Sequence, residues 1–193
     1  MANVYEVYVK GVSDMLQNRL SRELNKEISQ IPRGEREEWQ DENWKKKLYT
    51  MDIEGEEKVI WPSINIHSFL QAACKKYKVP PPNKDLGRTW TSYFNSCVIV
   101  TEPSIIEYEE IIPFSQMVNG NPSSGKKSSK VYSVRPLIRG WQTKMVFMDT
   151  EGFLTKEIVE EIVTKGGKFV GLSDWRPVYG RFTVTEIKVS GDE

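Results

Sequence analysis

Residues 168–184, KFVGLSDWRPVYGRFTV, decide which fold the rest of the chain is expected to adopt. Apolar residues at 169–170 and 182–184 predict two strands, joined by a loop rich in glycine, aromatic and arginine side chains. Arginines bind phosphates and aromatic rings stack on bases, so this loop supplies candidate nucleic-acid contacts. These are Trp175, Arg176, Tyr179 and Arg181. The alternative is a hairpin whose aromatic rings fill a core edge and whose arginines pair with acids.

Composition predicts a soluble globular chain, expected to form one domain over residues 1–193. Of its residues 38% are hydrophobic and 28% are charged, which is typical of this class. The 27 basic side chains balance the 27 acidic ones. Because non-specific nucleic-acid coats carry a basic excess, this balance counts against binding by the whole surface. It leaves room for a local basic groove.

Cysteine usage and hydropathy predict a cytoplasmic location. Cys74 and Cys97 are too few for a disulfide framework and are expected to be buried thiols. The first twelve residues alternate in hydropathy and include an acid, unlike a signal peptide. No apolar run approaches the 18 or so residues that a membrane span requires. We therefore expect no membrane association.

Hydrophobic periodicity predicts alternating strands and helices. Strands are expected at 3–12, 51–61 (a hairpin), 97–100 and 105–112, with a second hairpin at 130–138 and 141–148 and a third at 168–189. Helices are expected at 13–31, 35–49, 64–78 and 85–95, and from Thr155 until Gly166 and Gly167 end the last one. Residues 115–130 are polar and glycine-rich, which predicts a long mobile loop.

This order predicts an α+β fold with a mainly antiparallel sheet and helices on one face. A ferredoxin-like or RNA-recognition-like core fits the order of a strand, a helix, a central hairpin, a second helix and a last strand. Helical insertions are expected near 13–60 and 80–95.

Two motifs carry a resemblance to known proteins. One is VIWPSINIHSFLQAACKKYK at 59–78, and the other is GGKFVGLSDWRPVYGRFTV at 166–184. The sequence resembles a group of small uncharacterised bacteriophage proteins that end in a GLxDWRPxYGRF-like signature. That pattern is similar in turn to the RAMP superfamily, which includes the backbone subunits of CRISPR surveillance complexes. Pro62 and Ser63 match that superfamily's helix entry, and glycines of the closing segment match its glycine-rich loop, although Ser173 stands where glycine is expected.

The resemblance implies nucleic-acid binding, often as a repeated subunit along a strand, and supplies no catalytic residue. Residues 120–127 nearly match a phosphate-binding loop, but Lys127 replaces the magnesium-binding hydroxyl and a strand is expected to follow. His67 is the only histidine, and the cysteines lack paired metal spacing. We therefore expect no enzymatic activity, cofactor or metal.

The resulting hypothesis is a single-stranded nucleic-acid-binding protein, for RNA or DNA, that assembles as a homo-oligomer. Trp175 or Tyr179 is expected to stack on bases, and basic side chains to contact phosphates. The basic residues are Lys126, Lys127, Lys130, Arg135, Arg139, Arg176 and Arg181. The sheet core remains an alternative place for Tyr132 and Trp141. The alternative function is a phage-encoded module that inhibits or recruits a host defence complex, with residues 35–49 as its contact surface.

Overall fold

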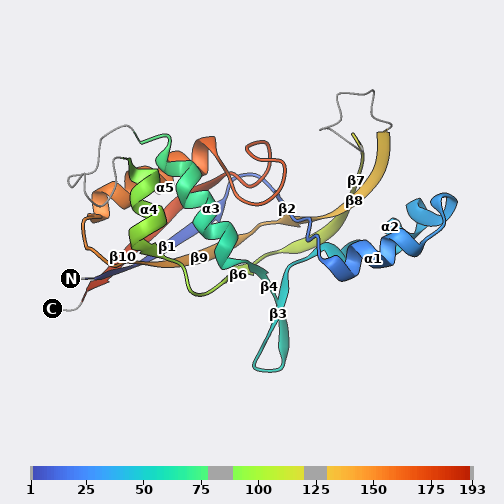
Figure 1. Ribbon diagram of the computed structural model, residues 1–193, viewed down its shortest axis with the longest axis horizontal. Helices are drawn as coiled ribbons and strands as arrows, with labels where there is room; N and C mark the ends of the chain where they lie inside the picture. The colour runs from blue at the N-terminus through green and yellow to red at the C-terminus, as the bar shows by residue number, and fades with distance from the viewer. Residues whose placement is uncertain (1, 78–88, 120–129, 192–193) are drawn as a thin grey trace.

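The computed structural model describes residues 2–77, 89–119 and 130–191 (Figure 1). Its helices are α1 (Arg22–Gln30), α2 (Arg36–Asn43), α3 (Ser63–Cys74), α4 (Trp90–Cys97) and α5 (Lys156–Phe169), with short 3-10 turns η1 (Arg33–Glu35) and η2 (Trp44–Lys47). Its strands are β1 (Asn3–Gly11), β2 (Met15–Leu16), β3 (Thr50–Ile53), β4 (Glu56–Trp61), β5 (Val98–Ile99), β6 (Ser104–Glu107), β7 (Glu110–Asn119), β8 (Lys130–Arg139), β9 (Gln142–Asp149) and β10 (Phe182–Gly191).

The central sheet has the order β10-β1-β9-β6-β4-β3, and β5 also pairs with β9. β1 is antiparallel to both β9 and β10, and β6 is antiparallel to β9. The core contains two strand–helix–strand units, β1-α3-β6 and β9-α5-β10. The two units are interlocked in the sheet, because β9 lies between β1 and β6 and β1 lies between β9 and β10. This is the ferredoxin-like arrangement, so the predicted fold class is confirmed.

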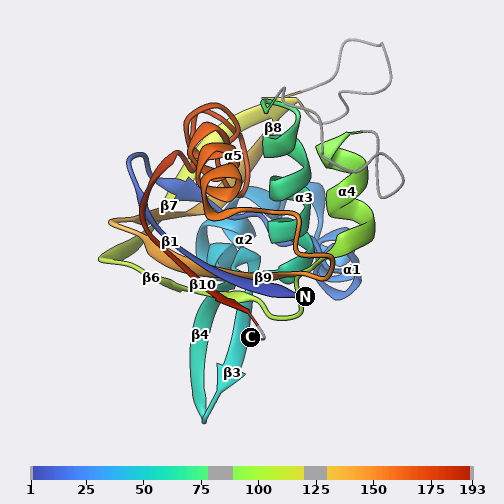
Figure 2. The same ribbon diagram turned by 90° about the vertical axis from the view of Figure 1, so that its left-hand side faces the viewer.

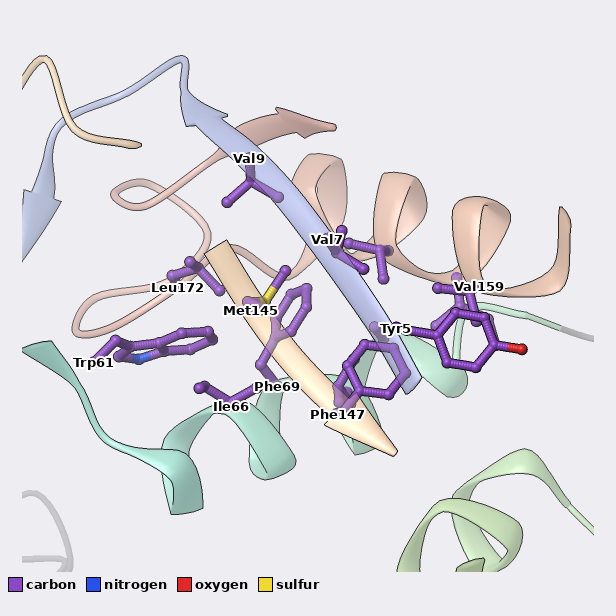
Figure 3. Packing of buried hydrophobic residues seen from close by; sticks show 14 of the residues in the cluster. Tyr5, Val7, Val9, Trp61, Ile66, Phe69, Met145, Phe147, Val159 and Leu172 are labelled. Atoms are coloured by element: carbon purple, nitrogen blue, oxygen red, sulfur yellow. The ribbon is translucent and has the colours of Figure 1, made fainter. Parts of the chain in front are cut away.

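Helices α3, α4 and α5 lie on one face of this sheet, and the β3–β4 hairpin projects on the other side (Figure 2). The alternation of β1 explains the packing: Tyr5, Val7 and Val9 are all 2% exposed or less, and their side chains point towards the helices. Figure 3 shows them against Met145 and Phe147 of β9 and the helical side chains. The main core therefore lies between the sheet and the three helices.

Gly166 and Gly167 lie inside α5, which continues to Phe169, so the predicted helix end and the strand at 169–170 are wrong. A methyl group on Gly166 would lie 2.6 Å from Phe69 and 2.7 Å from the Cβ of Ala73. The glycine therefore permits close packing of α5 on α3 instead of terminating the helix. Only β10 remains of the predicted closing hairpin.

A second sheet has the order β2-β8-β7, and its strands β7 and β8 lie between β6 and β9 in the chain. Its β7–β8 hairpin and the helices α1 and α2 extend away from α3, α4 and α5 (Figure 1). Because β8 pairs with β7 and β9 pairs with β1, the predicted hairpin of 130–138 with 141–148 is wrong. Residues 115–119 continue β7 instead of starting a loop. The rest of the predicted loop, residues 120–129, lies outside the described residues.

The segment predicted as one helix over 13–31 divides into β2 and α1. Met15 and Leu16 are fully buried and pair with Ile138 and Leu137 of β8, so tertiary pairing overrides helical spacing. Ser21 caps α1, accepting a hydrogen bond from the backbone N–H of Leu24 at 3.0 Å. In the described part of the chain, no helix combines the length and apolar character that a bilayer crossing requires.

Candidate nucleic-acid interface

The loop between α5 and β10, which we call the closing loop (residues 170–181), is fixed to the start of the chain. Gly180 donates its backbone N–H to the carbonyl of Asp14 at 2.8 Å, and Asp174 donates to the carbonyl of Leu16 at 3.0 Å. Gly180 has a φ of 73°, and a Cβ there would lie 1.9 Å from the carbonyl oxygen of Leu172. The backbone therefore requires glycine at this position.

Arg135 of β8 holds this loop from within. Its side chain is only 9% exposed, its guanidinium pairs with the carboxylate of Asp174, and its Cζ lies 4.1 Å from the centre of the Trp175 ring. Burial lowers the pKa of Arg135, and the Asp174 charge opposes this effect. Arg135 was predicted as a phosphate contact, but the structure buries it, and the ion pair and ring contact compensate for the cost of burial. Arg135 thus positions the loop and presents little surface to a ligand.

An aromatic cluster joins the closing loop to β7. Phe114 lies 6.1 Å from Trp175 and 5.7 Å from Tyr179 between ring centres, both edge-on, and Trp175 lies 6.3 Å from Tyr179. Trp175 and Tyr179 are half-buried. Phe114 was not among the predicted contacts, although it occupies β7, the strand that pairs with β8. The cluster agrees in part with the alternative in which the loop aromatics pack against the fold.

The other predicted arginines differ in whether they form ion pairs. Arg176 and Arg181 are exposed and form no ion pair with a carboxylate among the described residues. Arg181 donates from Nε to the carbonyl of Pro177 at 2.7 Å. Arg139 is paired with Glu110 at 2.8 Å and with Asp14 at 3.6 Å.

Of the three predicted lysines, the structure describes Lys130 alone. Lys130 is exposed at the start of β8, and Lys126 and Lys127 lie outside the described residues. Of the two aromatic residues left open, Trp141 is a core residue, 1% exposed, whose indole N–H donates to the Ser13 carbonyl at 2.8 Å. Tyr132 is half-buried on β8 and donates to Asp41 of α2 at 2.7 Å.

A cleft of about 260 Å³ lies between the closing loop and the first turns of α3. It brings together the two sequence motifs, because Trp61, Asn65 and Ser68 come from the helix entry and Arg176 comes from the closing loop. Its lining residues are Asn18, Leu20, Tyr49, Trp61, Asn65, Ser68, Ser173, Asp174 and Arg176. Of these, only Arg176 was predicted as a contact, because the others are drawn from segments far apart in the sequence.

The cleft is rich in polar groups without partners. Within the described parts of the chain, the side chains of Asn18, Tyr49 and Asn65 make no hydrogen bond. The indole N–H of Trp61 is buried and also lacks a partner. A buried donor left unpaired costs about 1–3 kcal/mol, so an acceptor there would be stabilising. The carboxylate of Asp174 is already engaged by Arg135 and by the backbone N–H of Trp175 at 3.0 Å.

Metal-binding chemistry has no support among the described residues, where no group of three or more potential ligands is found. His67 contacts the Phe94 carbonyl at 3.3 Å and the side chain of Gln71 at 3.0 Å. Burial raises the pKa of the Cys74 and Cys97 thiols, and both are free. Burial of the two thiols agrees with the sequence prediction.

Comparison with known proteins identifies a shared fold. No protein-family model and no curated protein sequence matches the chain. Among solved structures, a chain of a type III-B Cmr-β complex bound to cognate target RNA aligns with a TM-score of 0.55 and 11% identity, over 97% of this chain and 60% of that one. Cmr6 from Pyrococcus furiosus aligns with a TM-score of 0.50 and 10% identity, over 96% and 98% of the two chains.

The chain therefore shares its fold with Cmr6 and with the aligned chain of the Cmr-β complex. It spans three fifths of the length of the Cmr-β chain that it matches.

Proposed function

We propose that this chain is a non-enzymatic, RAMP-like protein of phage type that binds single-stranded nucleic acid and assembles as repeated subunits. One observation carries the proposal: the helix entry at the start of α3 and the closing loop line the same polar cleft, and the exposed side chain of Arg176 is part of that lining. Two further observations support it: the fold is shared with Cmr6, and it is shared with a chain from a complex that holds cognate target RNA.

The proposed contacts divide by charge and exposure. Arg176 and Arg181 are exposed and free of acidic partners in the described chain, so they contact phosphates first. Lys130, exposed at the start of β8, is a further phosphate contact, and Lys126 and Lys127, which lie outside the described residues, are proposed as phosphate contacts as well. Arg139 contributes less, because Glu110 and Asp14 already neutralise it. Tyr179 and Trp175 supply the stacking surface, with Phe114 behind them.

Fluorescence anisotropy with labelled RNA and DNA strands of roughly 30 nucleotides, titrated at low and high salt, tests the proposal. We expect affinity to fall as salt rises, and Arg176→Ala to weaken binding and reduce the slope of log K against log salt by about one. Arg33→Ala is the matched control, because Arg33 is an exposed arginine in η1, an element that contributes no residue to the cleft lining. Absence of binding to either polymer at micromolar protein contradicts the proposal.

A second function is favoured by an acidic groove between α1 and α2. It measures about 430 Å³, and it combines Glu27, Glu35, Glu38 and Glu42 with the apolar side chains of Ile31, Pro32 and Trp39. Such a surface suits a basic segment of a host protein, as expected of a module that recruits or inhibits a host complex. Lys46 covers part of it, pairing with Glu27 at 2.5 Å and lying 5.5 Å from the Trp39 ring centre.

The two functions separate in one experiment on a purified complex with a host protein. If the groove is the contact surface, the double variant Glu38→Lys/Glu42→Lys dissociates from the host protein and binds nucleic acid as wild type does. If the complex survives both charge reversals, the groove is not the contact surface.

A further inference from the structure

We propose that the cleft between the closing loop and α3 seats one unstacked base of the bound strand, and that the protein therefore prefers some bases over others. This inference rests on the proposed nucleic-acid binding and adds base readout to it. Phosphate contacts alone carry no sequence information, whereas hydrogen bonds to a base edge do.

The hydrogen-bonding groups of the cleft match a base edge. Asn18 precedes α1 and Asn65 lies in the first turn of α3, so the two amides reach the cleft from different elements. Each amide offers a carbonyl acceptor and two N–H donors, and neither is engaged within the described residues. Trp61, which also lines the cleft, has a buried indole N–H without a partner among the described residues. Base edges present this mixture of acceptors and donors.

The shape and charge of the cleft suit one nucleotide. Its volume of about 260 Å³ equals that of roughly nine liquid waters, which is of the order of a single planar base. Leu20, 64% exposed, and the half-buried ring of Tyr49 provide apolar surface against which a base face packs. The only lining carboxylate, Asp174, is neutralised by Arg135, while the exposed Arg176 lies where it can meet the adjoining phosphate.

Base readout is tested with equal-length oligo-A, oligo-C, oligo-G and oligo-U strands and an abasic strand. We expect the wild-type affinities to spread by roughly five-fold or more, with the abasic strand among the weakest. We expect Asn18→Ala and Asn65→Ala to narrow the spread of affinities among the strands to about two-fold or less, and to leave the salt dependence of the affinity unchanged. Arg176→Ala weakens all strands alike. Asn25→Ala, at an exposed position in α1, is the matched helix control for Asn65→Ala and leaves the spread as in wild type.

The indole N–H resonance of Trp61 gives an independent readout. Its signal is assigned by its absence from the spectrum of Trp61→Phe, and it is expected to shift when the preferred strand binds but not when the abasic strand binds. Equal affinity for every strand, the abasic one included, overturns base readout and leaves nucleic-acid binding standing. No binding to any strand overturns both, so the two failures are distinguishable.

Discussion

At the scale of single residues, Arg135 shows how a buried charge is used to position a surface loop. Arg135→Met leaves the carboxylate of Asp174 without its partner and removes the guanidinium from the Trp175 ring. We expect the free energy of unfolding to fall by about 1–3 kcal/mol, because Asp174, whose side chain is 32% exposed, loses a charge-assisted hydrogen bond. Urea unfolding of Arg135→Met, Asp174→Asn and the double variant measures this as a double-mutant cycle. A coupling energy near zero contradicts the role assigned to the pair.

Lys47 predicts a pH dependence of stability. It is 4% exposed, and its ammonium donates to Gln40 at 2.8 Å and to the Val134 carbonyl at 2.6 Å, without a carboxylate among its partners. Burial and, to a lesser extent, the charge of Arg135 together lower the pKa of Lys47 from 10.5 to about 8. Between about pH 8 and pH 10.5, Lys47 is protonated in the unfolded chain and largely deprotonated in the folded chain, so the unfolded chain binds more protons. The free energy of unfolding contributed by this group therefore rises with pH across that window.

The expected rise is about 1–3 kcal/mol between pH 8 and 10.5, and it vanishes below pH 8, where both states are protonated. Lys47→Met lacks this group, so the difference in stability between wild type and variant should grow in favour of wild type over the window. Guanidinium unfolding at several pH values measures it. Parallel pH profiles for the two proteins would show that Lys47 does not titrate in this range.

The candidate site was only partly predictable at this scale. Arg176 and Arg181 were predicted from residue type and loop chemistry, and the structure leaves both exposed. Asn18, Tyr49 and Asn65 were not, because each is an ordinary polar residue in its own segment and only the fold gathers them into one cleft. Arg135 was placed among the surface contacts because no sequence pattern shows that Asp174, 39 residues away, would be its partner.

At the scale of elements, the packing of α5 on α3 explains a glycine that sequence patterns associate with a helix end. Gly166→Ala adds a methyl group 2.6 Å from Phe69, so the helices must separate. Overpacking of this kind costs about 1–3 kcal/mol, which outweighs the gain of about 1 kcal/mol from replacing glycine in a helix. Gly34→Ala is the control, because a methyl group there has no neighbour within 4 Å. Thermal unfolding that ranks Gly166→Ala above wild type contradicts this packing.

The elements of the core were predicted better than those of the insertions. Strand alternation in β1 and helix periodicity in α3 report burial on one face, which the sheet and helices then satisfy. The insertion elements depend on distant partners instead: β2 forms because Leu16 pairs with Leu137, although the local spacing favours a helix. For the same reason β8 and β9, consecutive in the chain, belong to different sheets. Strand pairing between segments far apart in the sequence determines where these elements form, and local sequence patterns do not indicate such pairing.

At the scale of the whole molecule, charge balance limits the affinity of a single copy for a nucleic-acid strand. Lysine plus arginine equals aspartate plus glutamate, 27 each, so no general basic field supports binding and only local cations contribute. If about four phosphates are neutralised per copy, log K should fall with log salt at a slope of about −3 for a single strand. Repeated copies along one strand would raise the total affinity without any new contact in each subunit.

Assembly as repeated subunits predicts that the number of bound copies depends on strand length. Mass photometry of the protein with RNA strands of about 10, 20 and 40 nucleotides should show the number of bound copies increasing with length, because each copy covers a limited stretch of strand. Arg176→Ala should lower occupancy at every length, and Arg33→Ala should not. A single copy on every strand length would contradict assembly as repeated subunits while leaving strand binding intact. A fixed oligomer that forms without nucleic acid would instead place the assembly contacts in the protein alone.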